Sequence, residues 1–373
     1  MSLHPELGFF EKIRVINKSF VFLVIMTAMI GVGLLYSASG GSWDPWALSH
    51  LIKFLFSLSA MMFVAFLPIR WLAHGAYFVY LLVLILLIIV EIKGHIGMGA
   101  QRWINFGFIA LQPSELMKIA LILALARYFH NLNAYQTGLM KHLIMPGIMI
   151  AFPVALVLIQ PNLGTALLLI GTAVVVLFGA GIQMWKFVSV GISGLIAIPF
   201  MWQFFLKEYQ KKRILTFLNP DSDPLGAGYN IIQSKIALGS GGFFGKGFTH
   251  GSQGQLMFLP EKHTDFIFVL LAEEFGMLGC LFVMGLLISI ISYGMVQAMT
   301  SRNQFGRLVA LGVGMSFFFY LFVNIGMVSG LMPVVGIPIP LISFGGTAML
   351  TYMIGCGLLM NVSINRDIKL EKM

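Results

Sequence analysis

Long apolar runs alternate with short polar segments along most of the chain. A helix needs about 20 apolar residues to cross a bilayer, and the chain offers about ten such runs. The pattern therefore predicts an all-α polytopic membrane protein with about ten transmembrane helices. The predicted spans are Ser19–Ser39, Ala47–Leu67, Ala73–Ile92, Ser114–Phe129, Leu143–Gln160, Leu163–Gly181, Phe187–Leu206, Phe266–Ala298, Leu308–Leu331 and Ile342–Asn361.

Four features refine this organisation. The run that ends at Ala298 exceeds the length that a bilayer needs, which predicts a tilted helix or last turns outside the membrane. Residues 207–265, between the seventh and eighth spans, form a long predicted loop. No repeat of fixed period and no linker between soluble domains is evident, so we expect one multi-pass domain over residues 1–373. The first apolar run lacks a small-residue cleavage site and is predicted to be an anchor.

Composition agrees with a membrane protein, since 58% of the residues are hydrophobic and 10% are charged, whereas a soluble domain carries about 25% charge. The net charge of +9 could indicate nucleic-acid binding. The basic residues do not cluster on one amphipathic element, however, and positive loops of a membrane protein explain them better. Both cysteines lie in apolar runs and are predicted to be small buried residues.

The distribution of Lys and Arg predicts the orientation. With an even number of spans, both termini lie on one side of the membrane together with the loops after spans two, four, six and eight. The opposite short loops hold only Lys53, Lys93 and Arg102. Because basic loops stay inside, both termini are predicted to be cytoplasmic and the loop 207–265 extracytoplasmic. The basic residues on the predicted inner face are Lys12, Arg14, Lys18, Arg70, Arg127, Lys141, Lys186, Arg302, Arg307, Arg366, Lys369 and Lys372.

The end of the long loop carries the strongest candidate for chemistry. Asp265 closes the polar sequence Pro-Glu-Lys-His-Thr-Asp and directly precedes an apolar run. A carboxylate at the point where a loop enters a bilayer is costly, which makes it a functional candidate. Aspartate is also a favoured helix cap, so a structural role remains open.

A second candidate is the segment Gln112–Lys118. Its Pro-Ser sequence predicts a helix start with Ser114 as the cap. Glu115 and Lys118 are three residues apart and share a helix face. Inside a bilayer the two charges must pair with each other, meet water or meet a ligand. A purely structural ion pair and a substrate-binding pair are both open.

Other polar breaks gather on the same predicted outer side. Arg102 stands beside Trp103, a predicted interfacial anchor, and its planar guanidinium matches phosphate oxygens. Two Pro/Gly-rich breaks, residues 160–165 and 335–347, lie on that side as well. The asymmetry predicts a site that opens to the outside and is reachable from lipid.

Several common catalytic motifs are excluded. The glycine-rich segment Gly239–Gly247 lacks the spacing of a phosphate-binding loop, and we expect a flexible juxtamembrane loop there. The eight histidines show no spacing typical of a zinc site. The chain also has no Gly-x-Ser-x-Gly nucleophile elbow.

These segments together resemble a known family. G-A-Q-R-W-I, Q-P-S-E-L-M-K, Q-P-N-L-G-T, L-P-E-K-H-T-D-F-I-F, A-E-E-F-G and G-I-P-I-P-L-I-S-F-G-G resemble the shape, elongation, division and sporulation (SEDS) family, in the right order through nearly the whole chain. The resemblance implies a ten-span fold and a peptidoglycan glycosyltransferase that polymerises lipid II outside the cytoplasmic membrane. It implies as partners a class B penicillin-binding transpeptidase and the elongation machinery. Two segments, G-S-Q-G-Q-L-M-F-L-P-E and G-L-M-P-V-V-G-I-P-I-P, resemble the elongation branch of the family more than its division branch. This resemblance implies a role in cell elongation and rod shape.

The resemblance also implies site residues. The essential aspartate of the family matches Asp265, and the acid and base of its fourth span match Glu115 and Lys118. The family usually has Asp where this chain has Asn162, so Asn162 is not assigned a catalytic role. With the catalytic Asp265, the predicted substrate-binding residues are Arg102, Glu115, Lys118, Glu261, Lys262, His263 and Ser343, and no residue is predicted to be a metal ligand.

The implied reaction joins a sugar hydroxyl to an anomeric carbon that carries a lipid pyrophosphate. A base should take the hydroxyl proton, and Asp265 is the candidate. Since one strong carboxylate stands at the membrane edge, a single displacement with inversion is the preferred hypothesis. The departing pyrophosphate needs positive charge, from Arg102, Lys118 and Lys262 or from a divalent cation such as Mg²⁺ or Mn²⁺.

Two other functions compete with this prediction. About ten spans with intramembrane charges would also suit a transporter that flips a lipid-linked cell-wall precursor. Such a transporter should show broken helices in two related halves, and the sequence shows none. A scaffold that recruits the transpeptidase is the third possibility.

Overall fold

The structure, a computed structural model, describes residues 8–97, 100–105, 110–204, 208–222, 226–251 and 262–372. Ten of its helices coincide with the ten predicted spans: α2 (Lys18–Ala38), α3 (Ala47–Phe66), α4 (Ile69–Lys93), α5 (Pro113–His130), α7 (Ile144–Ile159), α8 (Leu163–Gly179), α9 (Met184–Phe204), α13 (Ile267–Thr300), α14 (Gln304–Val328) and α15 (Gly346–Ile364).

The remaining helical elements precede or connect these helices. They are α1 (Phe9–Val15), α6 (Ala134–Thr137), α10 (Glu208–Leu218), α11 (Ala227–Ser240) and the 3-10 turns η1 (Met140–Leu143) and η2 (Pro220–Ser222). By length and composition, seven helices among the described residues can cross a membrane, and α8 and α9 are shorter apolar helices. The predicted all-α polytopic fold is confirmed.

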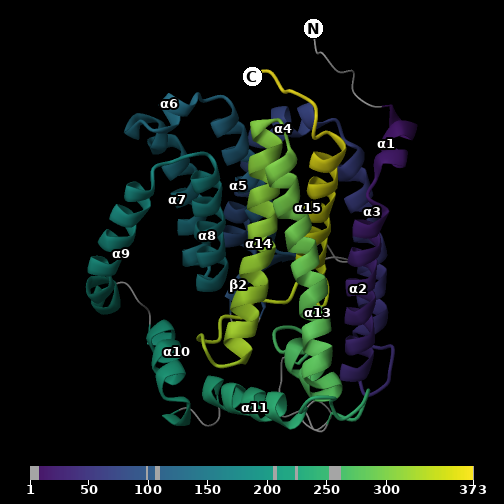
Figure 1. Cartoon of the computed structure of the whole chain (residues 1–373). Coiled ribbons are helices and arrows are strands. Elements are labelled where there is room, and N and C mark those ends of the chain that lie inside the picture. The colour runs from purple at the N-terminus through teal and green to yellow at the C-terminus, as the bar shows by residue number, and fades with distance from the viewer. Residues whose placement is uncertain are drawn as a thin grey trace.

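The tall helices form one bundle, with α1 and the segment after α15 at one end and α10 and α11 at the other (Figure 1). α14 lies at its centre and packs against α5, α8, α13 and α15. α9 stands apart from the bundle, and apolar side chains such as Val190 and Ile196 are exposed along it. Exposed apolar side chains are what a lipid environment requires of such a helix.

A small antiparallel sheet between α4 and α5 was not predicted. Its strands are β1 (His95–Gly97), β2 (Ala100–Asn105) and β3 (Ala110–Leu111), in the order β1-β2-β3. β1 and β3 have only three and two residues, and the six residues of β2, Ala-Gln-Arg-Trp-Ile-Asn, do not alternate between polar and apolar. The sheet carries Arg102 on β2.

Several predicted helix starts were wrong, and α4 and α14, for example, each begin four residues before the predicted start. α5 begins at Pro113 after Gln112, and Ser114 lies inside the helix rather than at its cap. Proline suits the first helical position because its missing N–H would have no partner there. α15 begins at Gly346 instead of Ile342, because residues 338–345, with two prolines and Leu341 at φ 66°, form an irregular segment first.

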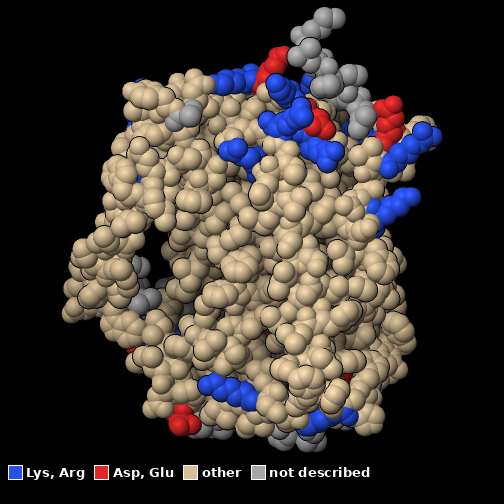
Figure 2. Space-filling model, in the orientation of Figure 1, with Lys and Arg blue, Asp and Glu red and all other residues tan. Residues whose placement is uncertain are grey.

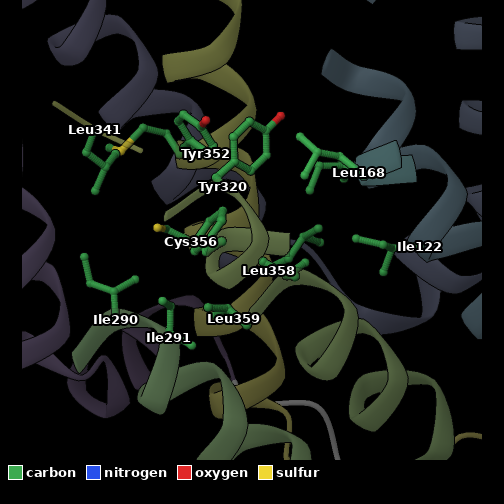
Figure 3. Close-up of a cluster of buried hydrophobic side chains, with 14 of the residues drawn as sticks. Ile122, Leu168, Ile290, Ile291, Tyr320, Leu341, Tyr352, Cys356, Leu358 and Leu359 are labelled. Atoms are coloured by element: carbon green, nitrogen blue, oxygen red, sulfur yellow. The ribbon is translucent and has the colours of Figure 1, made fainter. Parts of the chain in front are cut away.

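The centre of the bundle is a close-packed apolar core with two tyrosines at its edge. Ile290 and Ile291 of α13 lie beside Leu359 of α15 there (Figure 3). Tyr320 and Tyr352 lie side by side, with ring centroids 4.9 Å apart. Both rings are fully buried, and a buried tyrosine hydroxyl requires a hydrogen-bond partner.

The long helix α13 is broken near its start rather than simply tilted. Gly276 has φ 64° and ψ −161°, which no helix accommodates. The glycine-rich segment after α11 satisfies the backbone groups that the break releases. The amides of Met277 and Leu278 donate to the carbonyls of Gly242 and Phe243, at 3.0 and 3.3 Å.

The same segment binds the turn before the break. The amides of Lys246 and Gly247 donate to the carbonyls of Glu273 and Glu274, at 2.9 and 3.0 Å. The Lys246 ammonium also pairs with the buried Glu273 carboxylate at 2.8 Å. The expectation of a flexible loop here was wrong, because this segment is bound to α13 along its length.

We expect Gly276→Ala to destabilise the protein by about 1–3 kcal/mol or more, because its backbone conformation is nearly exclusive to glycine. A methyl group there would also lie 2.7 Å from the carbonyl oxygen of Phe243. Gly285→Ala is the matched control in the same helix, where an added carbon meets nothing within 4 Å. Thermal unfolding in detergent measures both, and equal midpoints would contradict the role assigned to the break.

Candidate active site

Asp265 lies in the turn that leads into α13, held between α14 and residues 329–345. The Asn324 side-chain amide donates to the carbonyls of Asp265 at 2.9 Å and of Ile337 at 2.6 Å. The Asp265 carboxylate faces Gly336, where an added Cβ would lie 3.1 Å from Oδ2. Asn324 is fully buried, so this arrangement fixes the backbone of the turn from inside the bundle.

Asp265 does not occupy the N-cap position of α13. The residue at that position is Phe266, whose side chain makes no capping hydrogen bond. Asp265 is one residue further from the helix and is partly exposed. Asp265 is therefore not the N-cap residue that the structural interpretation assumed.

Glu115 and Lys118 form the expected ion pair, buried inside the bundle. The Lys118 ammonium lies 2.7 Å from Glu115 Oε1. The Tyr320 hydroxyl donates to Glu115 Oε2 at 2.8 Å, and the Lys118 ammonium lies 4.3 Å from the Tyr320 ring centroid. The pair is thus satisfied on both sides, as buried charges must be.

Helix α14 brings this pair and Asp265 to one side of the protein. Tyr320, which binds Glu115, and Asn324, which binds the Asp265 turn, are four residues apart and share a helix face. Tyr352 packs against Tyr320, and its hydroxyl donates to the carbonyl of Pro338 at 3.3 Å. Residues 329–345 therefore line the same region as the two candidate groups.

The start of α15 completes the connection. The amide of Phe344 donates to the carbonyl of His263 at 2.9 Å. The Thr347 hydroxyl accepts from the Gln112 amide at 3.0 Å and donates to the Ala110 carbonyl at 2.9 Å. Residues 344–347 thus join the Asp265 turn to the start of α5, three residues before Glu115.

The other residues predicted to bind substrate near Asp265 have defined neighbours. The His263 ring stacks on Trp46, with centroids 4.4 Å apart and planes 8° apart. Lys262 is buried, and this burial lowers the pKa of its ammonium below the ordinary value. Ser343 is buried, and its hydroxyl accepts a hydrogen bond from the Ile339 amide at 2.8 Å. Glu261 lies outside the described residues.

Arg102 is bound to a different turn. Its Nε donates to the Gln160 carbonyl at 3.0 Å, and its Nη2 donates to the Pro161 carbonyl. Asn162 follows in that turn and caps α8 by accepting from the Thr165 amide at 3.4 Å. Asparagine caps a helix about as well as aspartate, so the amide at this position preserves the local structure.

Sequence reasoning missed Tyr320, Asn324 and Trp46. A signal existed for Asn324, because a side-chain amide inside an apolar run must find partners. Nothing in the sequence pairs Trp46 with His263 across more than 200 residues. Among the described residues, no group of three or more His, Cys, Asp or Glu side chains could hold a metal ion.

Comparison with known proteins decides the family. Residues 17–368 match the family of cell cycle proteins that comprises FtsW, RodA and SpoVE. The chain belongs to this family. The resemblance to the SEDS proteins that the sequence motifs indicated is therefore confirmed.

Two curated members of the FtsW/RodA/SpoVE family illustrate the relationship. The peptidoglycan glycosyltransferase MrdB of Escherichia coli is 41% identical over 96% of each chain. Stage V sporulation protein E of Bacillus subtilis is 34% identical over 92% of this chain and 95% of its own.

Solved structures extend the likeness to the fold. A chain from a structure titled for the coordination of polymerization and crosslinking by a peptidoglycan synthase complex is 30% identical, with a TM-score of 0.79, over 94% of this chain and 98% of its own. The rod shape determining protein RodA of Thermus thermophilus is 27% identical, with a TM-score of 0.71 and the same coverage. With its apolar helices and its membership of this family, the chain is a multi-pass membrane protein.

Proposed function

We propose that this protein is a peptidoglycan glycosyltransferase that polymerises lipid II into glycan strands for cell-wall elongation and rod shape. The observation that carries the proposal is the full-length relationship to MrdB, a peptidoglycan glycosyltransferase. The site supports it, because a partly exposed carboxylate and a buried acid–base pair lie on one side of the bundle, where a lipid-linked substrate can approach from the membrane.

Asp265 is the proposed general base. A sugar hydroxyl of one lipid-linked substrate attacks the anomeric carbon of a second lipid-linked substrate. Asp265 takes the hydroxyl proton as the new C–O bond forms. The bond between the anomeric carbon and the pyrophosphate oxygen breaks, and the lipid pyrophosphate leaves with the electron pair. One displacement inverts the anomeric centre, which agrees with Asp265 as the one carboxylate among the described residues 262–266 of this turn.

The leaving pyrophosphate needs compensation for its charge. Lys262 is in the Asp265 turn and Lys118 lies beside Glu115, whereas Arg102 is bound to the turn before α8. A divalent cation remains a proposal. Mg²⁺ commonly takes one or two carboxylates and the phosphates of a substrate, and the Asp265 carboxylate with a bound pyrophosphate would fit that set.

We propose a class B penicillin-binding transpeptidase, working within the elongation machinery, as the partner. Support comes from the likeness to a chain of a peptidoglycan synthase complex described as coordinating polymerization and crosslinking. Glycan strands made at the outer surface must then be crosslinked, so the two activities have a physical reason to stay together.

We propose that both termini are cytoplasmic. On the face shown in Figure 2, most Lys and Arg side chains lie at the end that carries the termini. Basic residues are retained on the cytoplasmic side. In the cytoplasmic membrane of a bacterium, this orientation places α10 and α11 on the outer side.

Cysteine labelling tests the orientation. In a background without Cys280 and Cys356, Phe244→Cys should react with an impermeant maleimide in intact spheroplasts. Phe10→Cys is the matched control at the other end, since both side chains are 79% exposed, and it should react only after lysis. The reverse result would place the proposed site on the wrong side of the membrane.

The function itself is tested with purified protein and labelled lipid II in detergent, with glycan strands separated on a gel. Polymer from the protein alone supports the glycosyltransferase. Absence of polymer together with movement of precursor across a liposome bilayer would favour the flippase. Absence of both, with retained binding of the transpeptidase, would favour the scaffold.

A further inference from the structure

Lys53 is a cation near the candidate site to which no role has yet been given. It was predicted to lie in a short loop but lies in the second turn of α3, and its ammonium stands 4.1 Å from the centroid of the Phe344 ring. It is partly buried within a helix that is apolar enough to span the membrane. Within the described part of the chain, no carboxylate pairs with it.

The contacts of Lys53 lead to both candidate groups. Phe344, under the ammonium, is hydrogen-bonded through its amide to His263, two residues before Asp265. Gly346 follows, and a Cβ there would lie 3.6 Å from Cδ and Cε of Lys53. The next residue, Thr347, binds the start of α5. Lys53 therefore stands over residues 344–346, the link between the Asp265 turn and the Glu115 helix.

Helix α3 is itself fixed in this position. The His50 ring, one turn before Lys53, is fully buried and lies 3.3 Å from the carbonyl of Leu341. Trp46, one turn earlier, stacks on His263. These two contacts hold the face of α3 that carries Lys53 against the site.

The energetics of Lys53 differ from those of Lys118. Lys118 has a carboxylate at 2.7 Å, whereas the described partner of Lys53 is an aromatic face. A cation over a ring gains less than the withdrawal of an ion from water can cost. An intramembrane cation with such weak compensation marks a ligand or a pathway.

We propose that Lys53 binds the diphosphate of a lipid-linked substrate. The proposal rests on the proposed glycosyl transfer and adds a binding residue to it. A lysine ammonium is a compact charge that suits phosphate oxygens. Located within the membrane beside residues 344–346, it meets the phosphates where the isoprenoid enters the bilayer, and the Asp265 turn lies on the sugar side.

Binding of farnesyl diphosphate to the purified full-length protein tests the proposal without any need for polymerisation. Lys53→Met and Lys53→Gln remove the charge, and both should weaken binding at least tenfold. Lys53→Arg should stay within about threefold of the natural protein, because it keeps the charge. Farnesol, which lacks phosphate, should bind all variants equally.

Lys93→Met is the matched control, since Lys93 is a lysine at the end of α4 and is exposed. It should leave diphosphate binding unchanged. A folded neutral variant at position 53 that binds farnesyl diphosphate within twofold of the natural protein would overturn the proposal. The proposal would also be overturned if Lys53→Arg folded and both neutral variants did not, because the cation would then serve the structure.

The polymerase assay distinguishes a failure of the Lys53 proposal from a failure of the proposed function. If the natural protein makes glycan, the neutral variants should raise the KM for lipid II at least tenfold with a smaller change in kcat. Unchanged KM would reject Lys53 as a binding residue and leave the glycosyltransferase intact. If the natural protein makes no glycan but loses farnesyl diphosphate on Lys53→Met, the failure is that of the proposed function alone.

Discussion

Asp265→Asn is expected to abolish glycan synthesis in a protein that still folds, reaches the membrane and binds its transpeptidase. Asparagine has nearly the same shape and keeps the backbone carbonyl that Asn324 holds. It cannot accept a proton near neutral pH. A general base contributes about 10²–10⁴-fold to rate, so strand formation per folded protein should fall by at least about 100-fold.

The same variant tests the structural alternative. If Asp265 served only as a helix cap, Asp265→Asn would keep most of the activity, and Asp265→Ala would lose about 1 kcal/mol of stability. Thermal stability is therefore measured beside strand formation for both variants. Near-normal polymerisation by a stable Asp265→Asn protein would contradict the catalytic role and the mechanism built on it.

The ten spans could be predicted because each depends on a local property, the length of an apolar run. The boundaries of α3 and α8 lie within two residues of the prediction. The Glu115–Lys118 pair could be predicted for the same reason, since three residues of helix place both side chains on one face.

The features that the sequence did not reveal depend on distant contacts. The break at Gly276 is stable because the segment after α11 supplies hydrogen bonds to its free backbone groups. Glycine inside an apolar run has many meanings in a membrane helix, so the break has no local signature. The glycine-rich segment was misjudged as flexible because its partner lies about 30 residues away along the chain.

The sequence predicted that Asp265 and the Glu115–Lys118 pair belong to one site only because both were placed on the same side of the membrane. The physical basis of the shared site is α14, whose Tyr320 and Asn324 each bind one of the two groups. Such a bridging helix carries no charge at these positions and looks like an ordinary span. A polar side chain inside an apolar run is the signal that could have identified it.

Exchange of the two charges, Glu115→Lys with Lys118→Glu, is expected to give a folded but inactive protein. Each single change, Glu115→Gln or Lys118→Met, leaves one buried charge without its partner, which costs about 3–5 kcal/mol. The exchanged pair restores the ion pair, so most of the lost stability should return. Activity should not return, because the phosphate of a bound substrate then meets a carboxylate where it requires an ammonium.

Tyr320 supplies the control for this exchange. Its hydroxyl donates to Glu115 in the natural protein, and the exchange removes that acceptor. Tyr320→Phe measures the cost of this hydrogen bond alone, about 0.5–1.5 kcal/mol or somewhat more because the acceptor is charged. If Tyr320→Phe is active and the exchanged protein is stable but inactive, the sign of the charge at each position matters to the reaction. Full activity of the exchanged protein would show that the pair is purely structural.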